Sequence, residues 1–215
     1  MKVCVVGANG QIGKQVVQLL KEGGEHTPLA MVRKQEQAAY FENLGVDTVF
    51  ASIADSVGKI SEAISGCDAI VFTAGSGGHT GPDQTLLIDL DGAVKTMEAA
   101  EQTGVKRFVM VSALGANQRE NWNEAIRPYY VAKHYADRLL VQSDLIYTIV
   151  RPGGLLNEEG TGKIAIGENL TRATIPRADV AKVIVTSLTE ERTYRKSFDL
   201  VSGDEPIADA LKKLS

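Results

Sequence analysis

Residues 2–13 read KVCVVGANGQIG, a short apolar run followed at once by three glycines with the spacing G-x-x-G-x-x-G. This spacing is a variant of the fingerprint that joins a strand to a helix in dinucleotide-binding folds. Gly7 allows a sharp turn, Gly10 lets the backbone approach a pyrophosphate, and Gly13 lets the helix pack close to the strand. The N–H groups and dipole of that helix then face the phosphates. The residues of the predicted pyrophosphate loop are Gly7, Asn9, Gly10, Gln11, Ile12 and Gly13.

Apolar runs and amphipathic stretches alternate along the rest of the chain. The expected strands are 2–6, 28–32, 46–50, 68–73, 105–111, 145–150 and one near 197–201. The expected helices are 10–22, 34–44, 56–65, 82–103, 124–142, 177–189 and 206–214. The strands are rich in Val, Ile and Phe without alternation, which is typical of parallel strands buried on both faces. The pattern predicts an α/β fold, a Rossmann-type doubly wound parallel sheet of about seven strands with helices on both faces.

We expect a single domain over residues 1–215, with a cofactor-binding core at 1–151 and a short substrate-side region at 152–215. Glycine-rich stretches at 74–82 and 153–168 are expected to be loops. Both follow predicted strands, and ligands of such sheets bind beyond the carboxyl ends of the strands. The two loops therefore belong to the side of the sheet on which function is expected.

The composition excludes several classes of protein. With 215 residues, 44% hydrophobic and 23% charged, the chain is an ordinary globular domain. A net charge of -4 and a pI near 5.5 argue against nucleic-acid or anionic membrane partners. No apolar stretch approaches the roughly 20 residues that a spanning helix needs, and the first strand leaves no room for a signal peptide. Cys4 and Cys67 are expected to be buried hydrophobes, and the spacing of potential ligands indicates no metal site. We expect a cytoplasmic protein.

A basic residue stands where NAD-specific proteins usually carry an acid. Arg33 follows the second expected strand, and the first acidic residue after it is Glu36. An acid at this place binds the ribose 2′-hydroxyl of NAD, whereas an arginine pairs with a 2′-phosphate. A solvated basic residue at a helix start is the ordinary alternative. We favour the cofactor interpretation, which predicts NADP(H).

Other strand ends carry candidate cofactor contacts. These are Thr73, Ala74 and Gly75 after the fourth strand, Ser52 and Ile53 after the third, and Pro152 and Gly153 after the sixth. Small residues let the backbone run beside a cofactor, and proline ends a strand. Each of these residues is also compatible with an ordinary strand-to-loop turn.

Ser112 ends the fifth expected strand, and the next helix carries the pattern Y-x-x-x-K at Tyr129 and Lys133. Residues four apart share a helix face, so Lys133 is expected beside Tyr129, where its charge lowers the pKa of the phenol. The tyrosine would then exchange a proton with a hydroxyl or carbonyl group during hydride transfer, while Ser112 holds the same oxygen. The pattern Y-x-x-x-K alone is common by chance. His79, in the loop above this site, is a candidate substrate contact.

In this order the motifs resemble the atypical, NADP-binding branch of the short-chain dehydrogenase/reductase superfamily. Its members are often labelled NAD(P)-binding or NAD-dependent epimerase/dehydratase proteins. The resemblance covers essentially the whole chain and rests on GANGQIG, DAIVFTAGSGG, KRFVMVSALGA, YYVAKHYAD, YTIVRPGGLLNE and IPRADVA. It implies that Ser112, Tyr129 and Lys133 match the family's catalytic serine, tyrosine and lysine. It further implies that Lys133 holds ribose, that the glycines hold the pyrophosphate and that Arg33 holds the 2′-phosphate.

Two departures from the family pattern bear on function. Asp89 stands where the resemblance implies a catalytic asparagine, and an ionised carboxylate cannot donate a hydrogen bond. Residues 152–215 leave little room for groups that would hold a nucleotide sugar, which argues against a nucleotide-sugar epimerase. The leading hypothesis is an NADP(H)-dependent oxidoreductase of a small carbonyl or hydroxyl compound. The alternatives are an NADP(H)-sensing protein without turnover and a flavin or quinone reductase. Helices 82–103 and 124–142 would form either a homodimer face or a solvated surface.

Overall fold

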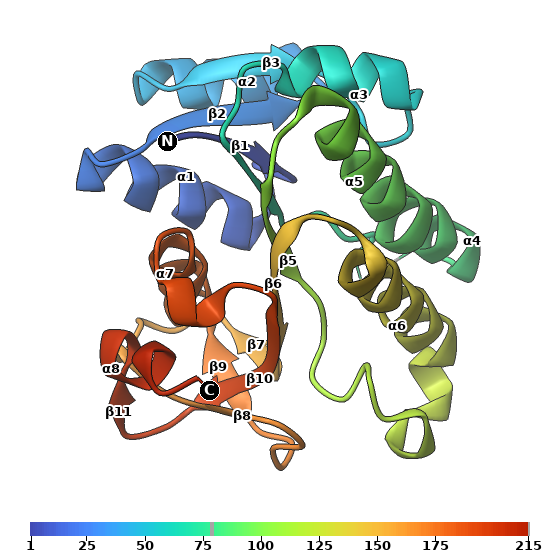
Figure 1. Cartoon of the computed structure of the whole chain (residues 1–215), viewed down its shortest axis with the longest axis vertical. Helices are drawn as coiled ribbons and strands as arrows, with labels where there is room; N and C mark the ends of the chain where they lie inside the picture. The colour runs from blue at the N-terminus through green and yellow to red at the C-terminus, as the bar shows by residue number, and fades with distance from the viewer. Residues whose placement is uncertain (78–79, 215) are drawn as a thin grey trace.

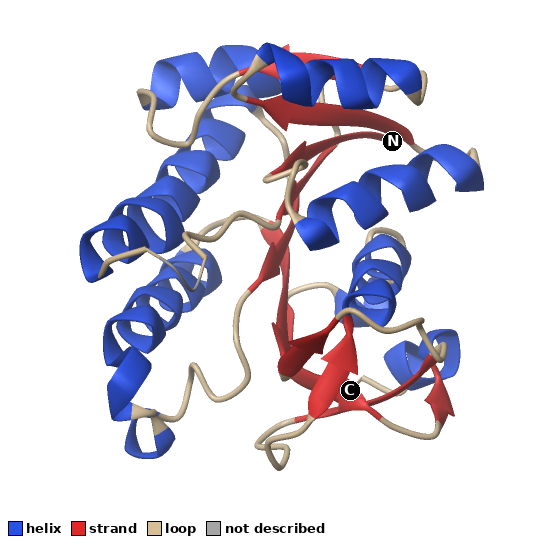
Figure 2. Ribbon diagram, turned by 180° about the vertical axis from the view of Figure 1, so that it is seen from behind, coloured by secondary structure: helices blue, strands red, loops and turns tan. Residues whose placement is uncertain are grey.

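The computed structural model describes residues 1–77 and 80–214 and places one large sheet between two layers of helices (Figures 1 and 2). The strands are β1 (Lys2–Val6), β2 (Thr27–Val32), β3 (Asp47–Phe50), β4 (Ala69–Phe72), β5 (Arg107–Val111), β6 (Ile146–Pro152), β7 (Gly154–Leu156), β8 (Lys163–Gly167), β9 (Thr174–Pro176), β10 (Lys196–Ser202) and β11 (Glu205–Pro206). The α-helices are α1 (Gln11–Gly23), α2 (Gln35–Asn43), α3 (Val57–Ile64), α4 (Pro82–Gln84), α5 (Gly92–Thr103), α6 (Arg127–Gln142), α7 (Arg177–Ser187) and α8 (Ile207–Lys212). A π-helix, η1 (Thr85–Asp91), and the 3-10 turns η2 (Arg119–Asn121), η3 (Glu124–Ile126) and η4 (Glu191–Thr193) complete the described elements. His79 lies outside the described residues.

The main sheet has nine strands in the order β11-β8-β10-β6-β5-β4-β1-β2-β3. Seven neighbouring strands of this sheet run parallel, in the order β10-β6-β5-β4-β1-β2-β3. They correspond to the seven strands expected from the sequence. The chain moves outward from β1 in one direction through β2 and β3, then in the other through β4, β5 and β6. This reversal is the switch point at which open α/β sheets bind ligands. The predicted doubly wound Rossmann-type fold is confirmed.

Alternation of side chains along β1 divides the core into two layers. Val3 and Val5 pack in the cluster that includes residues of α1, α2, α7 and α8. Cys4 and Val6 point to the opposite face and pack with residues of α3, α5 and α6. Figure 1 shows α1 and α7 on one side of the sheet and α5 and α6 on the other. Cys4 and Cys67 are both buried and carry free thiols, as predicted.

The expectation of a loop over 153–168 is wrong, because this stretch contains β7 and β8. β7 pairs with β9 in a separate two-stranded sheet. β8 runs antiparallel to β10 and extends the main sheet beyond its parallel part. Ile164 in β8 is fully buried, and this burial stabilises the strand. The glycines on either side of β8 led to the expectation of a loop.

The expected helix 82–103 is interrupted. It begins as α4, continues as the π-helix η1 and becomes α-helical again at Gly92. A Cβ on Gly92 would lie 2.8 Å from Cδ1 and 3.1 Å from Cβ of Ile53, so the start of α5 packs closely against the loop after β3. π-helical turns are rare and often occur at functional sites. The helix expected over 124–142 starts with the 3-10 turn η3, and its α-helical part begins at Arg127.

Candidate functional site

The glycines of the first loop make a close crossing between β1, α1 and the end of β4. Gly7 has φ +84°, and a Cβ there would lie 2.6 Å from the backbone nitrogen of Ala74. A Cβ on Gly13 would lie 2.2 Å from the carbonyl oxygen of Gly7, whereas one on Gly10 would be 3.2 Å from it. Gly7 and Gly13 therefore serve packing, while Gly10 keeps the approach to the helix open.

The N-terminus of α1 fits an anionic ligand. Gly10 is its N-cap, no side chain caps the first turn, and that turn contains no acidic residue. The free N–H groups and the helix dipole thus face the space beside Gly10. This is the arrangement by which such folds hold the pyrophosphate of a dinucleotide.

Two cavities meet at this loop, and both are lined by Gly10 and by residues 73–75. We call them the Arg33 cavity, with a volume of about 570 Å³, and the Tyr129 cavity, with about 560 Å³. They extend in two directions from the switch point between β1 and β4. An elongated ligand can therefore lie across the loop with one end in each cavity.

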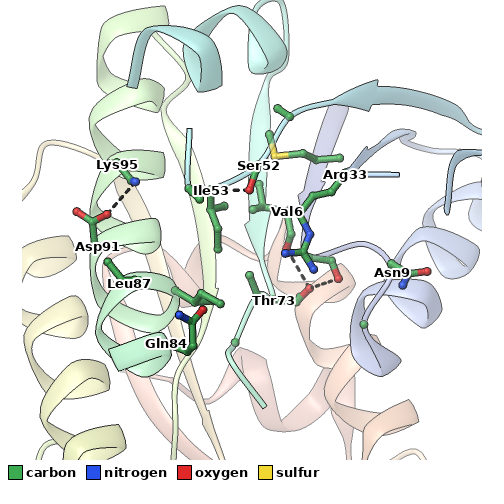
Figure 3. A pocket seen from close by; sticks show the side chains of 18 of the residues that line it. Val6, Asn9, Arg33, Ser52, Ile53, Thr73, Gln84, Leu87, Asp91 and Lys95 are labelled. Atoms are coloured by element: carbon green, nitrogen blue, oxygen red, sulfur yellow. Dashed lines mark hydrogen bonds and ion pairs between the residues drawn. The ribbon is translucent and has the colours of Figure 1, made fainter. Parts of the chain in front are cut away.

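The Arg33 cavity contains the residues predicted for the adenosine end of a cofactor (Figure 3). Its wall includes Gly7, Asn9, Gly10, Arg33, Ser52, Ile53, Thr73, Ala74 and Gly75. Arg33 is exposed at the end of β2, and its backbone N–H donates to Oε1 of Gln37 over 2.9 Å. Among the described residues of the wall, Asp91 is the one carboxylate, and it pairs with Lys95 at 2.8 Å (Figure 3). Arg33 is therefore free to meet an anion.

Thr73 has a structural task beyond lining the cavities. Its hydroxyl donates to the carbonyl oxygens of Val6 and Gly7, at 3.1 and 3.3 Å. Its backbone N–H also donates to Val6 over 2.9 Å. These bonds join the ends of β4 and β1, so that a threonine at this position stabilises the glycine loop.

The Tyr129 cavity brings together the four residues predicted to be catalytic, Ser112, Tyr129, Lys133 and Asp89. Gln11 and Ile12 of the glycine loop line it as well. Lys133 lies with Nζ 3.1 Å from Oδ1 of Asp89, donates to the carbonyl oxygen of Val111 over 3.2 Å, and is 5.7 Å from the ring centroid of Tyr129. Asp89, Ser112 and Lys133 are only 1%, 3% and 4% exposed. The ion pair is therefore strongly shielded from water.

The electrostatics of this cavity differ from the expectation of a lowered tyrosine pKa. Burial raises the pKa of Tyr129, and the opposing effect of Lys133 is too small to reverse this. Asp89 adds to the rise, because its negative charge repels a phenolate. Burial alone would lower the pKa of Lys133, but it is outweighed by the phenolate form of Tyr129, by the charge and hydrogen bond of Asp89, and by the charge of Asp137, so that this pKa is raised. Near neutral pH the site therefore holds a neutral phenol beside an ammonium group.

Asp89 also fixes the loop that follows β4. Its Oδ2 accepts the backbone N–H of Ser76 over 3.0 Å, and Ser76 Oγ lies 3.3 Å from Oγ1 of Thr85. Both Asp89 and Thr85 come from η1. Ser76 and Thr85 line the Tyr129 cavity too. Sequence reasoning missed Thr85 because a π-helix has no regular α-helical spacing, and it missed Ser76 because this loop residue is positioned by its contact with Asp89.

Pro152 and Gly153 are not brought to the wall of either cavity. A Cβ on Gly153 would lie 2.2 Å from the carbonyl oxygen of Ala173, so this glycine permits close packing of the backbone. The 152–215 region instead contributes Leu155 and Arg177 to the Tyr129 cavity. The motif IPRADVA contains Arg177 and was the one sequence signal for it.

The doubly wound sheet and the glycine loop at its switch point define a dinucleotide-binding fold. The chain belongs to the NAD(P)H-binding family, whose sequence model matches residues 7–191. This membership confirms the resemblance to atypical short-chain dehydrogenases/reductases and to epimerase/dehydratase-like proteins.

Three relatives illustrate the similarity. An "uncharacterized sugar epimerase" of Bacillus subtilis is 58% identical over 214 residues, with both chains fully covered. The solved structure of a candidate NAD-dependent epimerase/dehydratase from Bacillus halodurans has a TM-score of 0.94 and 45% identity, again over 100% of each chain. An oxidoreductase structure from Lactococcus lactis has a TM-score of 0.91 and 35% identity, over 100% of this chain and 96% of that one.

Within residues 1–77 and 80–214, no helix has the length and apolar character needed to cross a membrane. The same residues contain no group of three or more His, Cys, Asp and Glu side chains placed to hold a metal ion.

Proposed function

We propose that this protein is an NADP(H)-dependent oxidoreductase that reduces a small carbonyl compound. The observation that carries the proposal is the Tyr129 cavity, in which Ser112, Tyr129 and Lys133 line a space continuous with the glycine loop. Leu155 and Arg177, from the proposed substrate-side region 152–215, line the same cavity. A cytoplasmic location, and a homodimer through 82–103 and 124–142, stay predictions.

The raised pKa of Tyr129 supports a role as proton donor, because the phenol holds its proton near neutral pH. A reduced nicotinamide bound at this site would supply the hydride that the carbonyl carbon accepts. Tyr129 gives its proton to the carbonyl oxygen, and the product is an alcohol. Ser112 Oγ donates a hydrogen bond to the same oxygen and holds it near the phenol. Lys133 stabilises the phenolate that remains until a proton returns from solvent.

Arg33 supports NADP(H) over NAD(H). Its guanidinium lies at the wall of the Arg33 cavity, where the 2′-phosphate of a bound cofactor would be placed. Asp91 is the one carboxylate in the described part of this wall, and it is paired with Lys95, so no unpaired carboxylate of that wall is available to a ribose hydroxyl. Pairing between guanidinium and phosphate is charge-assisted and bidentate, and NADH offers no phosphate at this position.

The decisive test is oxidation of NADPH across a panel of aldehydes, ketones, quinones and flavins, with Tyr129→Phe alongside the unaltered protein. We expect turnover with at least one carbonyl compound and a loss of about 10²-fold or more in the variant, with unchanged NADPH affinity. Full activity of Tyr129→Phe on that substrate would refute the assignment.

A second candidate is an NADP(H)-binding protein without carbonyl turnover. The ion pair between Asp89 and Lys133 favours it, because the charge that would activate Tyr129 is largely neutralised. Tight NADPH binding with no oxidation by any acceptor would support this candidate. Flavin or quinone reduction that survives Tyr129→Phe would instead indicate a reductase that needs only hydride geometry.

A further inference from the structure

The wall of the Tyr129 cavity contains a cation, Arg177, that has no role in the proposed carbonyl reduction. Arg177 is the first residue of α7 and lines this cavity together with Leu155, Tyr129 and Lys133. It does not line the Arg33 cavity. The side chain is partly buried, and its Nη1 donates to the carbonyl oxygen of Leu155 over 3.2 Å and to Oδ1 of Asn157 over 2.8 Å. These two bonds hold the guanidinium in place through one of its three nitrogens.

The charge of Arg177 is not compensated by an ion pair with any described residue. The nearest acid along its own helix, Asp179, instead accepts from the backbone N–H groups of Thr161 and Gly162. Asp89, the one carboxylate in the described wall of the cavity, pairs with Lys133. The Nε and Nη2 groups of Arg177 have no hydrogen-bond acceptor within the part of the chain that the structure describes. The wall thus carries one paired cation and one unpaired cation.

The position of Arg177 strengthens its positive field. It stands at the N-terminal end of an eleven-residue helix, where the helix dipole is positive and a cation is disfavoured. An anion bound at the guanidinium relieves this unfavourable placement. The remaining wall is mainly apolar, through Ile12, Val111, Ile126, Pro128 and Leu155. The cavity therefore fits a ligand with an apolar body and a single anionic end.

We propose that Arg177 binds a carboxylate of the substrate, so that the protein acts on carbonyl compounds that carry an acid group. The inference rests on the proposed function and specifies its substrate class. The carbonyl oxygen lies between Ser112 and Tyr129, and the carboxylate lies on Arg177, which lines the same cavity. The cofactor pyrophosphate is the competing anion, but it has its own donors at the N-terminus of α1, and Arg177 is absent from the cavity on the other side of that loop.

The test compares three acids with their methyl esters: 4-carboxybenzaldehyde, succinic semialdehyde and 2-oxobutyrate. Each ester keeps the carbonyl group of its acid, and a small neutral methyl ester replaces the negative charge. In the unaltered protein we expect kcat/KM with NADPH to be about tenfold or more higher for at least one acid than for its ester. Arg177→Met keeps an unbranched apolar side chain and removes the guanidinium. It should abolish this preference while kcat/KM for the ester stays within about threefold of its value in the unaltered protein, and Arg177→Lys should restore part of the preference. The control is Lys182→Met, which removes a cation of the same helix that does not line the Tyr129 cavity. It should change kcat/KM for neither the acid nor the ester.

Binding of the same acids and esters to the NADP⁺ complex, measured by calorimetry, separates this inference from the proposed function. Binding that discriminates acid from ester through Arg177, without turnover, would sustain the inference and defeat the reductase. Weaker NADPH binding in Arg177→Met, with acid and ester affected alike, would assign the guanidinium to the pyrophosphate and overturn the inference. Failure of all three pairs to show a charge preference in either binding or turnover would overturn it too.

Discussion

Replacing Asp89 by asparagine tests how the buried ion pair controls Tyr129. Nζ of Lys133 is 3.1 Å from Oδ1 of Asp89 and 5.7 Å from the Tyr129 ring centroid, which places the carboxylate within about 9 Å of the ring. At an effective dielectric of about 20, a unit charge at this distance repels a phenolate by about 2 kcal/mol. Removal of the charge should therefore shift the equilibrium from phenol toward phenolate by roughly thirtyfold. Tyr129 should ionise at a clearly lower pH in Asp89→Asn.

The assay is the ultraviolet absorbance of tyrosinate as a function of pH, which needs no substrate. Subtracting the curve of Tyr129→Phe from that of the unaltered protein isolates Tyr129, and the same subtraction is made in the Asp89→Asn background. Asparagine still offers one oxygen to the N–H of Ser76, so the loop contact is kept. Asp91→Asn is the matched control, because it makes the same change in η1 at a half-exposed carboxylate that pairs with Lys95. Ionisation of Tyr129 at the same pH with and without Asp89 would refute the electrostatic reasoning.

Two further predictions concern the cofactor site and the fold. Arg33→Ala should weaken NADPH binding by about 1.5–3 kcal/mol while NADH binding barely changes, as measured by calorimetry; equal losses for both would contradict a role at the 2′-phosphate. Gly13→Ala should destabilise the fold by about 1–3 kcal/mol, because the new Cβ would lie 2.2 Å from a backbone oxygen. Gly58→Ala in α3 is its control: it meets nothing within 4 Å and should raise stability by about 0.5–1 kcal/mol in denaturant unfolding. Similar results for the two alanine variants would show that the crossing at Gly13 is not tight.

The parallel sheet was predictable because its signal is local. Each parallel strand is a short apolar run next to a turn residue, and the loop from Gly7 to Gly13 indicates how the first strand meets its helix. β8 was not predictable in the same way, because it forms only where β10 offers an edge far along the chain. Burial of Ile164 depends on that long-range pairing, and its flanking glycines favour a loop when the stretch is considered alone.

The candidate site shows the same division. Ser112, Tyr129 and Lys133 follow from a strand end and a helical spacing, and the structure places them at one cavity. The ion pair between Asp89 and Lys133 joins η1 to α6. Because these helices lie far apart in the sequence, the spacing of residues does not predict this contact. The sign of the effect on Tyr129 was missed for this reason, since burial and a second charge act against Lys133. Arg177 was overlooked because its partners, Leu155 and Asn157, belong to a stretch expected to be a loop.

The π-helix η1 lets the segment before Gly92 and the helix α5 after it direct their side chains to different parts of the molecule, which a regular α-helix of fixed spacing would not allow. Upstream of Gly92 the helix must present Thr85 and Asp89 to the Tyr129 cavity and Leu87 to the Arg33 cavity. Downstream, α5 must keep Met97 and Ala100 in the apolar layer between the sheet and its neighbours. The wider π turn holds more residues than an α turn, so it rotates one half of the helix relative to the other. Residues of η1 can therefore line both cavities while α5 keeps its own apolar face toward the sheet, an arrangement that the spacing of a regular α-helix would not give.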